Sequence, residues 1–138
     1  MKRYLLDTNI CIAILKKASN VAKAISQIEM SQCYISEITV IELKIGAVLG
    51  KAKAPRGKYV DQHIDSFIDN LTVIPISTSI DFFAEEKVRL QLAGTPAHNN
   101  FDLLIGCTAV TNDLIMVTDN IKDFKNIKGI KIENWIER

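Results

Sequence analysis

Short apolar runs alternate with segments of helical periodicity along this chain, and that alternation constrains the fold more than any other feature. Between the runs, apolar residues recur every three to four positions, the spacing of one helix face. Strands that alternate with helices predict an α/β fold with a mainly parallel sheet. The length of 138 residues fits one domain with one core, over residues 1–138. The predicted strands are 3–6, 33–36, 73–76, 114–118 and 129–133, and the predicted helices are 9–17, 21–29, 37–49, 60–70, 80–92 and 101–111.

Local signals set the ends of two predicted helices. Thr8 is placed to cap the helix that starts at Asn9. Gly50 is placed to end the helix that starts at Glu37, so 51–58 is predicted to be a loop.

Composition and cysteine usage narrow the class of protein. Apolar residues make up 48% of the chain, enough for a core without disulfides. No apolar run reaches the about 18 residues of a membrane span, and the N-terminal run ends at Asp7, too early for a signal peptide. A cytoplasmic location is therefore expected. Cys11, Cys33 and Cys107 form no CxxC pair, and we interpret them as reduced, buried side chains.

Four acidic residues stand where apolar residues would be expected. Asp7 and Asp119 each close an apolar run, whereas Glu42 and Asp102 lie inside one. A carboxylate in apolar surroundings is costly unless something compensates it. No run of Lys or Arg adjoins these acids, which points to a cation. The carboxyl ends of parallel strands, where Asp7 and Asp119 fall, are also where ligands bind in such sheets.

Each acid also has a simpler explanation. Asp7 can cap a helix, Asp102 can favour the first turn of one, and Asp119 can belong to a turn. Glu42 is harder to explain in this way, because its spacing from Ile38 and Ile45 places it on the apolar stripe of its helix. One metal site explains all four residues together.

The metal expected at such a site is Mg²⁺ or Mn²⁺. Hard oxygen ligands select hard cations, and Mg²⁺ needs only one or two carboxylates beside water and phosphate. Two such ions can also promote phosphodiester cleavage. His63 and His98 lack the partner spacing of a zinc site.

At this point the sequence resembles the PIN-domain ribonucleases, and most closely the VapC toxins of bacterial toxin–antitoxin pairs. The resemblance covers essentially the whole chain. Four motifs in family-like order carry it, together with the C-terminal segment: Leu5–Asn9, Thr39–Leu43, Phe101–Ala109, Val117–Phe124 and Gly129–Trp135.

The resemblance implies a three-layer α/β/α fold with a central parallel five-stranded sheet, and Mg²⁺- or Mn²⁺-dependent endonucleolytic cleavage of RNA. It assigns metal-site roles to Asp7, Glu42 and Asp102, with Thr8 and Asn9 as orienting groups. It also implies a cognate antitoxin as partner and a homodimer, and no association with membranes.

The fourth position of the site is open between two neighbours. The family pattern places an acid or Asn two residues after Thr118, which is Asn120, whereas Asp119 falls one residue earlier. We favour Asp119 as the catalytic and metal-binding acid, since a carboxylate binds a cation better than an amide does. Thr118 and Asn120 are then supporting residues.

The net charge of +1 gives no general sign of a nucleic-acid partner. Four basic residues nevertheless cluster without an acid among them, and they are candidates for contacting the RNA backbone or an acidic partner: Lys51, Lys53, Arg56 and Lys58. The alternative for this segment is a solvated loop.

Other functions for such a chain fit less well. A phosphatase with an aspartate nucleophile needs a second Asp two residues later, where this chain has Asn9. A phosphorelay receiver needs a Lys directly after a late strand, which is missing after Thr118. A non-catalytic binding module on the same PIN-like fold stays open as the alternative.

Overall fold

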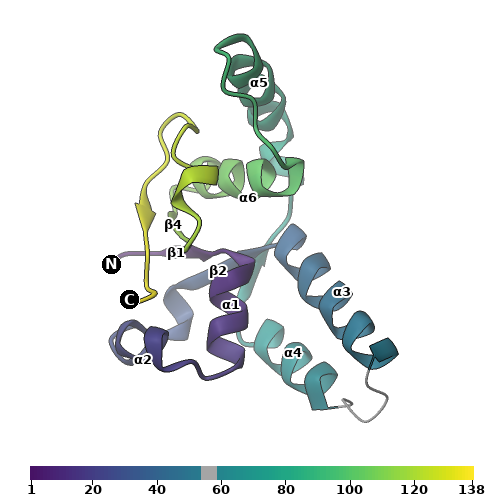
Figure 1. Ribbon diagram of the computed structural model, residues 1–138. Helices are drawn as coiled ribbons and strands as arrows, with labels where there is room; N and C mark the ends of the chain where they lie inside the picture. The colour runs from purple at the N-terminus through teal and green to yellow at the C-terminus, as the bar shows by residue number, and fades with distance from the viewer. Residues whose placement is uncertain (54–58) are drawn as a thin grey trace.

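Five parallel strands form the centre of this computed structural model, which describes residues 1–53 and 59–138. The strand order is β3-β2-β1-β4-β5, and all four pairings are parallel (Figure 1). The predicted α/β architecture and the parallel five-stranded sheet are therefore confirmed. The strands are β1 (Tyr4–Leu6), β2 (Cys33–Ser36), β3 (Thr72–Ile74), β4 (Ile115–Val117) and β5 (Ile132–Glu133).

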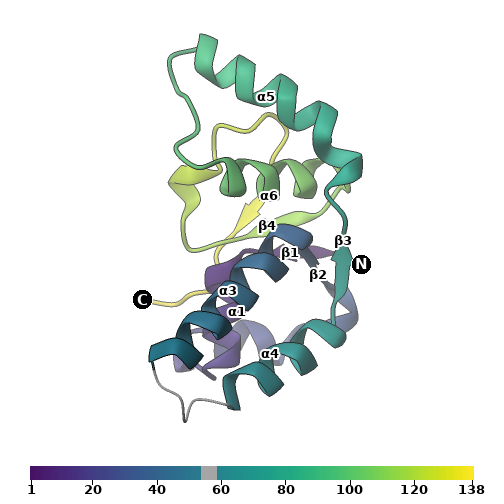
Figure 2. The same cartoon turned by 90° about the vertical axis from the view of Figure 1, so that its right-hand side faces the viewer.

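Helices cover both faces of the sheet, because strand side chains alternate between two apolar clusters. Tyr4 and Leu6 pack on one side with residues of α1 (Thr8–Leu15), α2 (Ser19–Ser26) and α4 (Tyr59–Asp69). Leu5 packs on the other side with residues of α5 (Ile80–Leu92) and α6 (Asn100–Thr111). Figure 2 shows α5 and α6 on the opposite side of the strands from α1 and α4. The result is a three-layer α/β/α fold.

Helix α3 (Glu37–Lys53) differs from the sequence prediction in two respects. It continues through Gly50, where we expected it to end, since one glycine in a long helix costs only about 1 kcal/mol relative to alanine. Lys51 and Lys53 thus belong to the helix and not to a loop. Arg56 and Lys58 lie outside the described residues.

The second difference concerns the face of α3 that packs on the core. The predicted apolar stripe is largely exposed: Ile45 is 56% and Val48 69% accessible. Leu43 and Ala47 are buried instead, together with Ile38. Two apolar stripes share this helix, and both have helical spacing, so periodicity alone does not identify the one that faces the core. We call the exposed set, Ile41, Ile45, Val48 and Leu49, the outer α3 face.

The prediction that the three cysteines are reduced and buried is confirmed. All three cysteines are free and buried. None of the described helices is long and apolar enough to cross a bilayer. The cap of α1 is a correction: the helix begins at Thr8, and its cap is Asp7, whose carboxylate accepts the Thr8 N–H.

Candidate active site

Asp7 forms the centre of the site at the carboxyl edge of the sheet, directly after β1. Its side chain is nearly buried, with 5% of the residue accessible. One carboxylate oxygen accepts the N–H of Thr8 at 2.8 Å, and the other accepts the hydroxyl of Thr118 at 2.8 Å. Thr118 directly follows β4, the strand beside β1. Both strand ends therefore hold one carboxylate in a fixed orientation.

Glu42 reaches the same edge from α3. The Thr8 hydroxyl donates to Glu42 Oε1 at 2.5 Å and lies 3.2 Å from the hydroxyl oxygen of the buried Thr39. Thr8 thus connects two acids, with its N–H on Asp7 and its hydroxyl on Glu42. The neighbouring Asn9 is exposed in the first turn of α1.

Asp102 enters the site from the first turn of α6. This helix is capped by Asn99, whose side chain accepts the N–H groups of Phe101 and Asp102. Burial, followed by the charges of three other carboxylates, raises the pKa of Asp102 to about 6. Those three are Asp7, Glu42 and Asp123.

The pKa of Asp7 is raised as well, and burial is again the largest cause. The hydrogen bonds from Thr118 and Thr8 oppose the rise, whereas the charges of Glu42 and Asp123 add to it. Like charges gathered in a partly dry site oppose ionisation, so this cluster carries more negative charge than its surroundings compensate. We call Asp7, Glu42, Asp102 and Asp123 the acidic cluster.

The structure does not bring Asp119, our favoured fourth acid, into this cluster. Its carboxylate forms an ion pair with Arg138 and accepts a hydrogen bond from Asn134 Nδ2 at 3.0 Å. Both contacts lower the pKa of Asp119. The C-terminal segment therefore neutralises this acid, and it needs no cation.

Asp123 is the acid that the sequence argument missed. It ends the short 3-10 helix Ile121–Asp123, which follows directly after Asn120. Asn120 donates its N–H to the Thr118 hydroxyl at 2.9 Å and its side-chain amide to Asp123 Oδ2 at 2.5 Å. Asn120 thus orients an acid of the cluster. The available signal was the position of Asp123, three residues after Asn120 in the last quoted motif.

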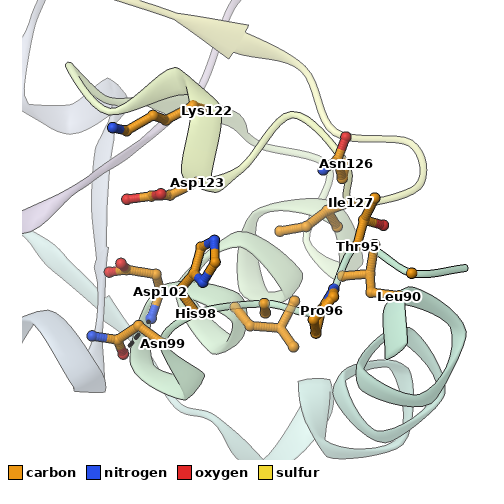
Figure 3. Close-up of a pocket in the computed structure, with 13 residues that line it drawn as sticks. Leu90, Thr95, Pro96, His98, Asn99, Asp102, Lys122, Asp123, Asn126 and Ile127 are labelled. Carbon is orange, nitrogen blue, oxygen red and sulfur yellow. Dashed lines mark hydrogen bonds between the residues drawn. The ribbon is translucent and has the colours of Figure 1, made fainter. Parts of the chain in front are cut away.

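A cavity of about 260 Å³ opens beside the acidic cluster, and Asp102 and Asp123 both line it. Figure 3 shows these two carboxylates on the same side of the cavity. Lys122 and His98 line it as well. A substrate bound in this cavity would thus contact two acids of the cluster.

The cluster suits a hard cation in its donor atoms and its charge. All four side chains offer carboxylate oxygens, and an ion would offset the burial and the mutual repulsion that raise the pKa values of Asp7 and Asp102. Within residues 1–53 and 59–138, no three Asp, Glu, His or Cys side chains stand at the spacing of a complete metal-binding group. Mg²⁺ needs only one or two protein carboxylates, with water and phosphate oxygens completing its shell.

Comparisons with known proteins agree with this geometry. The family model described as the PIN domain matches residues 4–130. The chain is 33% identical to the tRNA(fMet)-specific endonuclease VapC of Salmonella typhimurium, over 98% of this chain and 99% of the relative. It is also 33% identical to ribonuclease VapC2 of Rickettsia felis, over 96% and 97% of the two chains.

Solved structures give the same result at the level of the fold. The structure of DNA-bound VapBC from Salmonella typhimurium aligns with a TM-score of 0.82 and 32% identity, covering 98% of this chain and 99% of the other. VapBC2 from Rickettsia felis, bound to a promoter DNA fragment, aligns with a TM-score of 0.75 and 31% identity, covering 96% and 98%.

Proposed function

Since this chain belongs to the PIN-domain family and to its VapC ribonucleases, we propose that it is an endoribonuclease that hydrolyses RNA phosphodiester bonds with Mg²⁺ or Mn²⁺. The observation that carries the proposal is the acidic cluster at the carboxyl edge of the sheet. Four carboxylates from β1, α3, α6 and the segment after β4 are gathered there, although their charges oppose one another.

The acids of the cluster and the residues beside them have different roles in binding a cation. Asp7 and Asp102, the two acids with raised pKa values, would bind it, with Glu42 and Asp123 facing the same space. A divalent ion held by these residues would supply an activated water for attack and a charge that stabilises the leaving oxygen. Thr8, Thr118 and Asn120 orient the acids through the hydrogen bonds described above.

We further propose that the protein is the toxin of a toxin–antitoxin pair in the cytoplasm. The two solved structures compared above, from Salmonella typhimurium and Rickettsia felis, are VapBC complexes. Two apolar surfaces suit protein partners, which we take to be a cognate antitoxin and a second copy of this chain. One is the outer α3 face. The other is a cavity of about 370 Å³ between α1, α3 and α4, which Glu42 lines together with Ile12 and Leu15. A partner segment bound there would contact the acidic cluster.

The direct test is Asp7→Asn. The asparagine oxygen can accept the Thr8 N–H, and its amide can donate to the Thr118 hydroxyl, so the fold should persist. The charge that attracts the cation is lost. We expect cleavage of a single-stranded RNA with Mn²⁺ to fall at least about 100-fold, since even residues that only support a metal ligand cost up to this much.

Asp119→Asn is the matched control, because it removes an acid of the same type outside the cluster. Both variants should be purified as the wild type is, and assayed with Mn²⁺, with Mg²⁺ and with EDTA. Cleavage by Asp7→Asn at the wild-type rate would remove Asp7 from the mechanism. A wild type that cleaves no RNA with Mn²⁺ or Mg²⁺ would refute the proposed function and favour a binding module.

A further inference from the structure

The cavity beside the acidic cluster has two chemically different ends. Figure 3 shows Asp102 and Asp123 on one side of His98, and Pro96, Leu90 and Ile127 on the other. The loop between α5 and α6 forms one wall, and the segment around Asn126 forms the opposite wall. A ligand that fills it has an apolar part and lies next to the acids.

The first wall is fixed at both of its ends. Gly94 lies just after α5 with a φ of 79°, and its N–H donates to the carbonyl of Gln91. The N–H of the next residue, Thr95, donates to the carbonyl of Leu90 at 2.9 Å. This pair of bonds is a Schellman motif, which needs the left-handed conformation that glycine adopts easily. Asn99 caps α6 at the other end of the loop. His98 is therefore held between two anchored points.

An ion pair between the buried Glu86 and the exposed Arg89, outside the acidic cluster, supports the second wall. Glu86 is only 2% accessible, and it accepts two hydrogen bonds from Arg89 at 2.7 Å and one from the Lys128 N–H at 2.8 Å. Arg89 also donates to the carbonyl of Asn126 at 2.8 Å. The pair ties α5 to the segment that carries Asn126 and Ile127. The cavity is thus a built feature and not a gap between mobile loops.

The size and lining of the cavity suit a nucleobase. Its volume is below the about 300–1,000 Å³ that is typical of sites for drug-sized ligands. The lining combines apolar side chains with a ring and with polar groups, namely His98, Thr95 and Asn126. Proteins bind unpaired RNA bases in this manner, by stacking them on rings and bonding their polar edges. A phosphate is unsuited to the apolar end, because the side chains of Leu90, Pro96 and Ile127 cannot donate hydrogen bonds to it.

We propose that this cavity binds one unstacked base of the RNA strand, adjacent to the bond that is cleaved, with His98 as its stacking platform. This proposal rests on the proposed ribonuclease function and assigns a base-binding subsite to the same active site. Lys122 lies at the same end of the cavity as the acids (Figure 3), where it can contact the backbone of the RNA. Cleavage then requires an unpaired nucleotide, so loops and single strands are substrates and continuous duplexes are not.

The test combines protein and RNA changes. The cleavage site is first mapped with the wild type on a single-stranded RNA, and each flanking position is then made abasic in turn. We expect one abasic position to lower kcat/KM about 5- to 150-fold, the range reported for loss of one base–aromatic stack. His98→Ala should give a similar loss on the normal RNA and little further loss on that abasic RNA, because both changes remove the same contact.

Two variants control the interpretation. His98→Phe keeps a ring and should recover most of the activity, whereas Gln91→Ala, on the exposed side of α5, should cleave as the wild type does. The proposal is overturned if His98→Ala does not lower kcat/KM. It is also overturned if the losses in kcat/KM from His98→Ala and from the abasic substitution multiply at every position.

The binding of RNA to Asp7→Asn separates this proposal from the ribonuclease function. Fluorescence anisotropy with the same RNAs reports the subsite without cleavage. If the wild type cleaves no RNA but binding still depends on both the base and His98, the proposed nuclease function is rejected and the base-binding subsite is retained. Cleavage with binding that ignores both changes would reject the base site alone.

Discussion

Replacing Asp102 with asparagine should change how the stability of the metal-free protein depends on pH. The pKa of Asp102 is about 6 in the folded chain and near 3.8 when unfolded. Between these values the folded chain binds more protons at this position, so the free energy of unfolding falls as pH rises. The destabilisation develops as pH rises to about 6 and is complete about one pH unit higher. An asparagine at this position carries no charge at any pH, so the Asp102→Asn variant should escape the destabilisation.

The magnitude follows from the pKa difference. A shift of about two units corresponds to about 3 kcal/mol if it is taken at face value. Asp102 is partly exposed, and solvent screens its neighbours, so about 1 kcal/mol is the expected effect. For a chain of this length, that difference corresponds to about 3–5 °C in melting temperature.

The assay is a set of thermal melts in EDTA at pH 4 and pH 7.5. Wild type and Asp102→Asn should melt together at pH 4, and the variant should melt higher at pH 7.5. Saturating Mn²⁺ at pH 7.5 should then stabilise the wild type, by about 2.7 kcal/mol at 100 times its Kd, and stabilise the variant less.

Asp119→Asn is a control for which we expect the opposite effect on stability at pH 7.5. Contacts with Asn134 and Arg138 lower the pKa of Asp119, so its charge stabilises the fold above the unfolded pKa, and this contribution is lost as pH falls. The variant should therefore melt below the wild type at pH 7.5. Equal pH profiles for wild type and Asp102→Asn would refute the like-charge argument, and a full Mn²⁺ response in Asp102→Asn would remove Asp102 from the metal site.

Three further predictions concern the fourth site position, a buried hydroxyl and the basic segment. Asp123→Asn should lower Mn²⁺-dependent cleavage at least about 10-fold and Asn120→Ala somewhat less, whereas equal losses for Asp123→Asn and Asp119→Asn would contradict the placement of these acids. Thr118→Val should lower the free energy of unfolding by about 1–3 kcal/mol, because the buried carboxylate of Asp7 loses a hydrogen-bond donor. The urea midpoint should fall accordingly, and an unchanged midpoint would contradict the importance of this hydrogen bond. Replacing the four basic residues of 51–58 with serine should flatten the salt dependence of RNA binding by about 0.7 per lost phosphate contact, and an unchanged slope would leave the segment a solvated surface.

Local sequence patterns predicted most of the fold because they report the contacts that build it. Strand-like runs and helical periods are local, and their alternation leads to a parallel sheet with ligands at its carboxyl edge. Asp7, Glu42 and Asp102 lie close together there, as the hypothesis of one metal site and the family resemblance both predict. Their roles in metal binding and catalysis stay a proposal.

The misplaced predictions depend on contacts between distant parts of the chain. Arg138 neutralises Asp119 from 19 positions away, and no local pattern reports that pairing. The turn after Thr118 directs Asp123, and not Asp119, toward the other acids. The outer α3 face has the same periodicity as a buried stripe, and only packing against α1 and α4 distinguishes the two.

The pairing of β1 with β4 has a consequence for biosynthesis. Asp7 is oriented by Thr118, which is 111 positions later in the chain. At the usual elongation rate of about 5–20 residues per second, roughly 6 to 22 seconds separate the synthesis of these two residues. β1 can pair with β2 early but with β4 only after this interval, and the acidic cluster cannot assemble on a nascent chain that ends before β4. A ribosome that makes this protein is therefore not exposed to its activity before β4 has been synthesised, and truncated products that end before β4 should be inert.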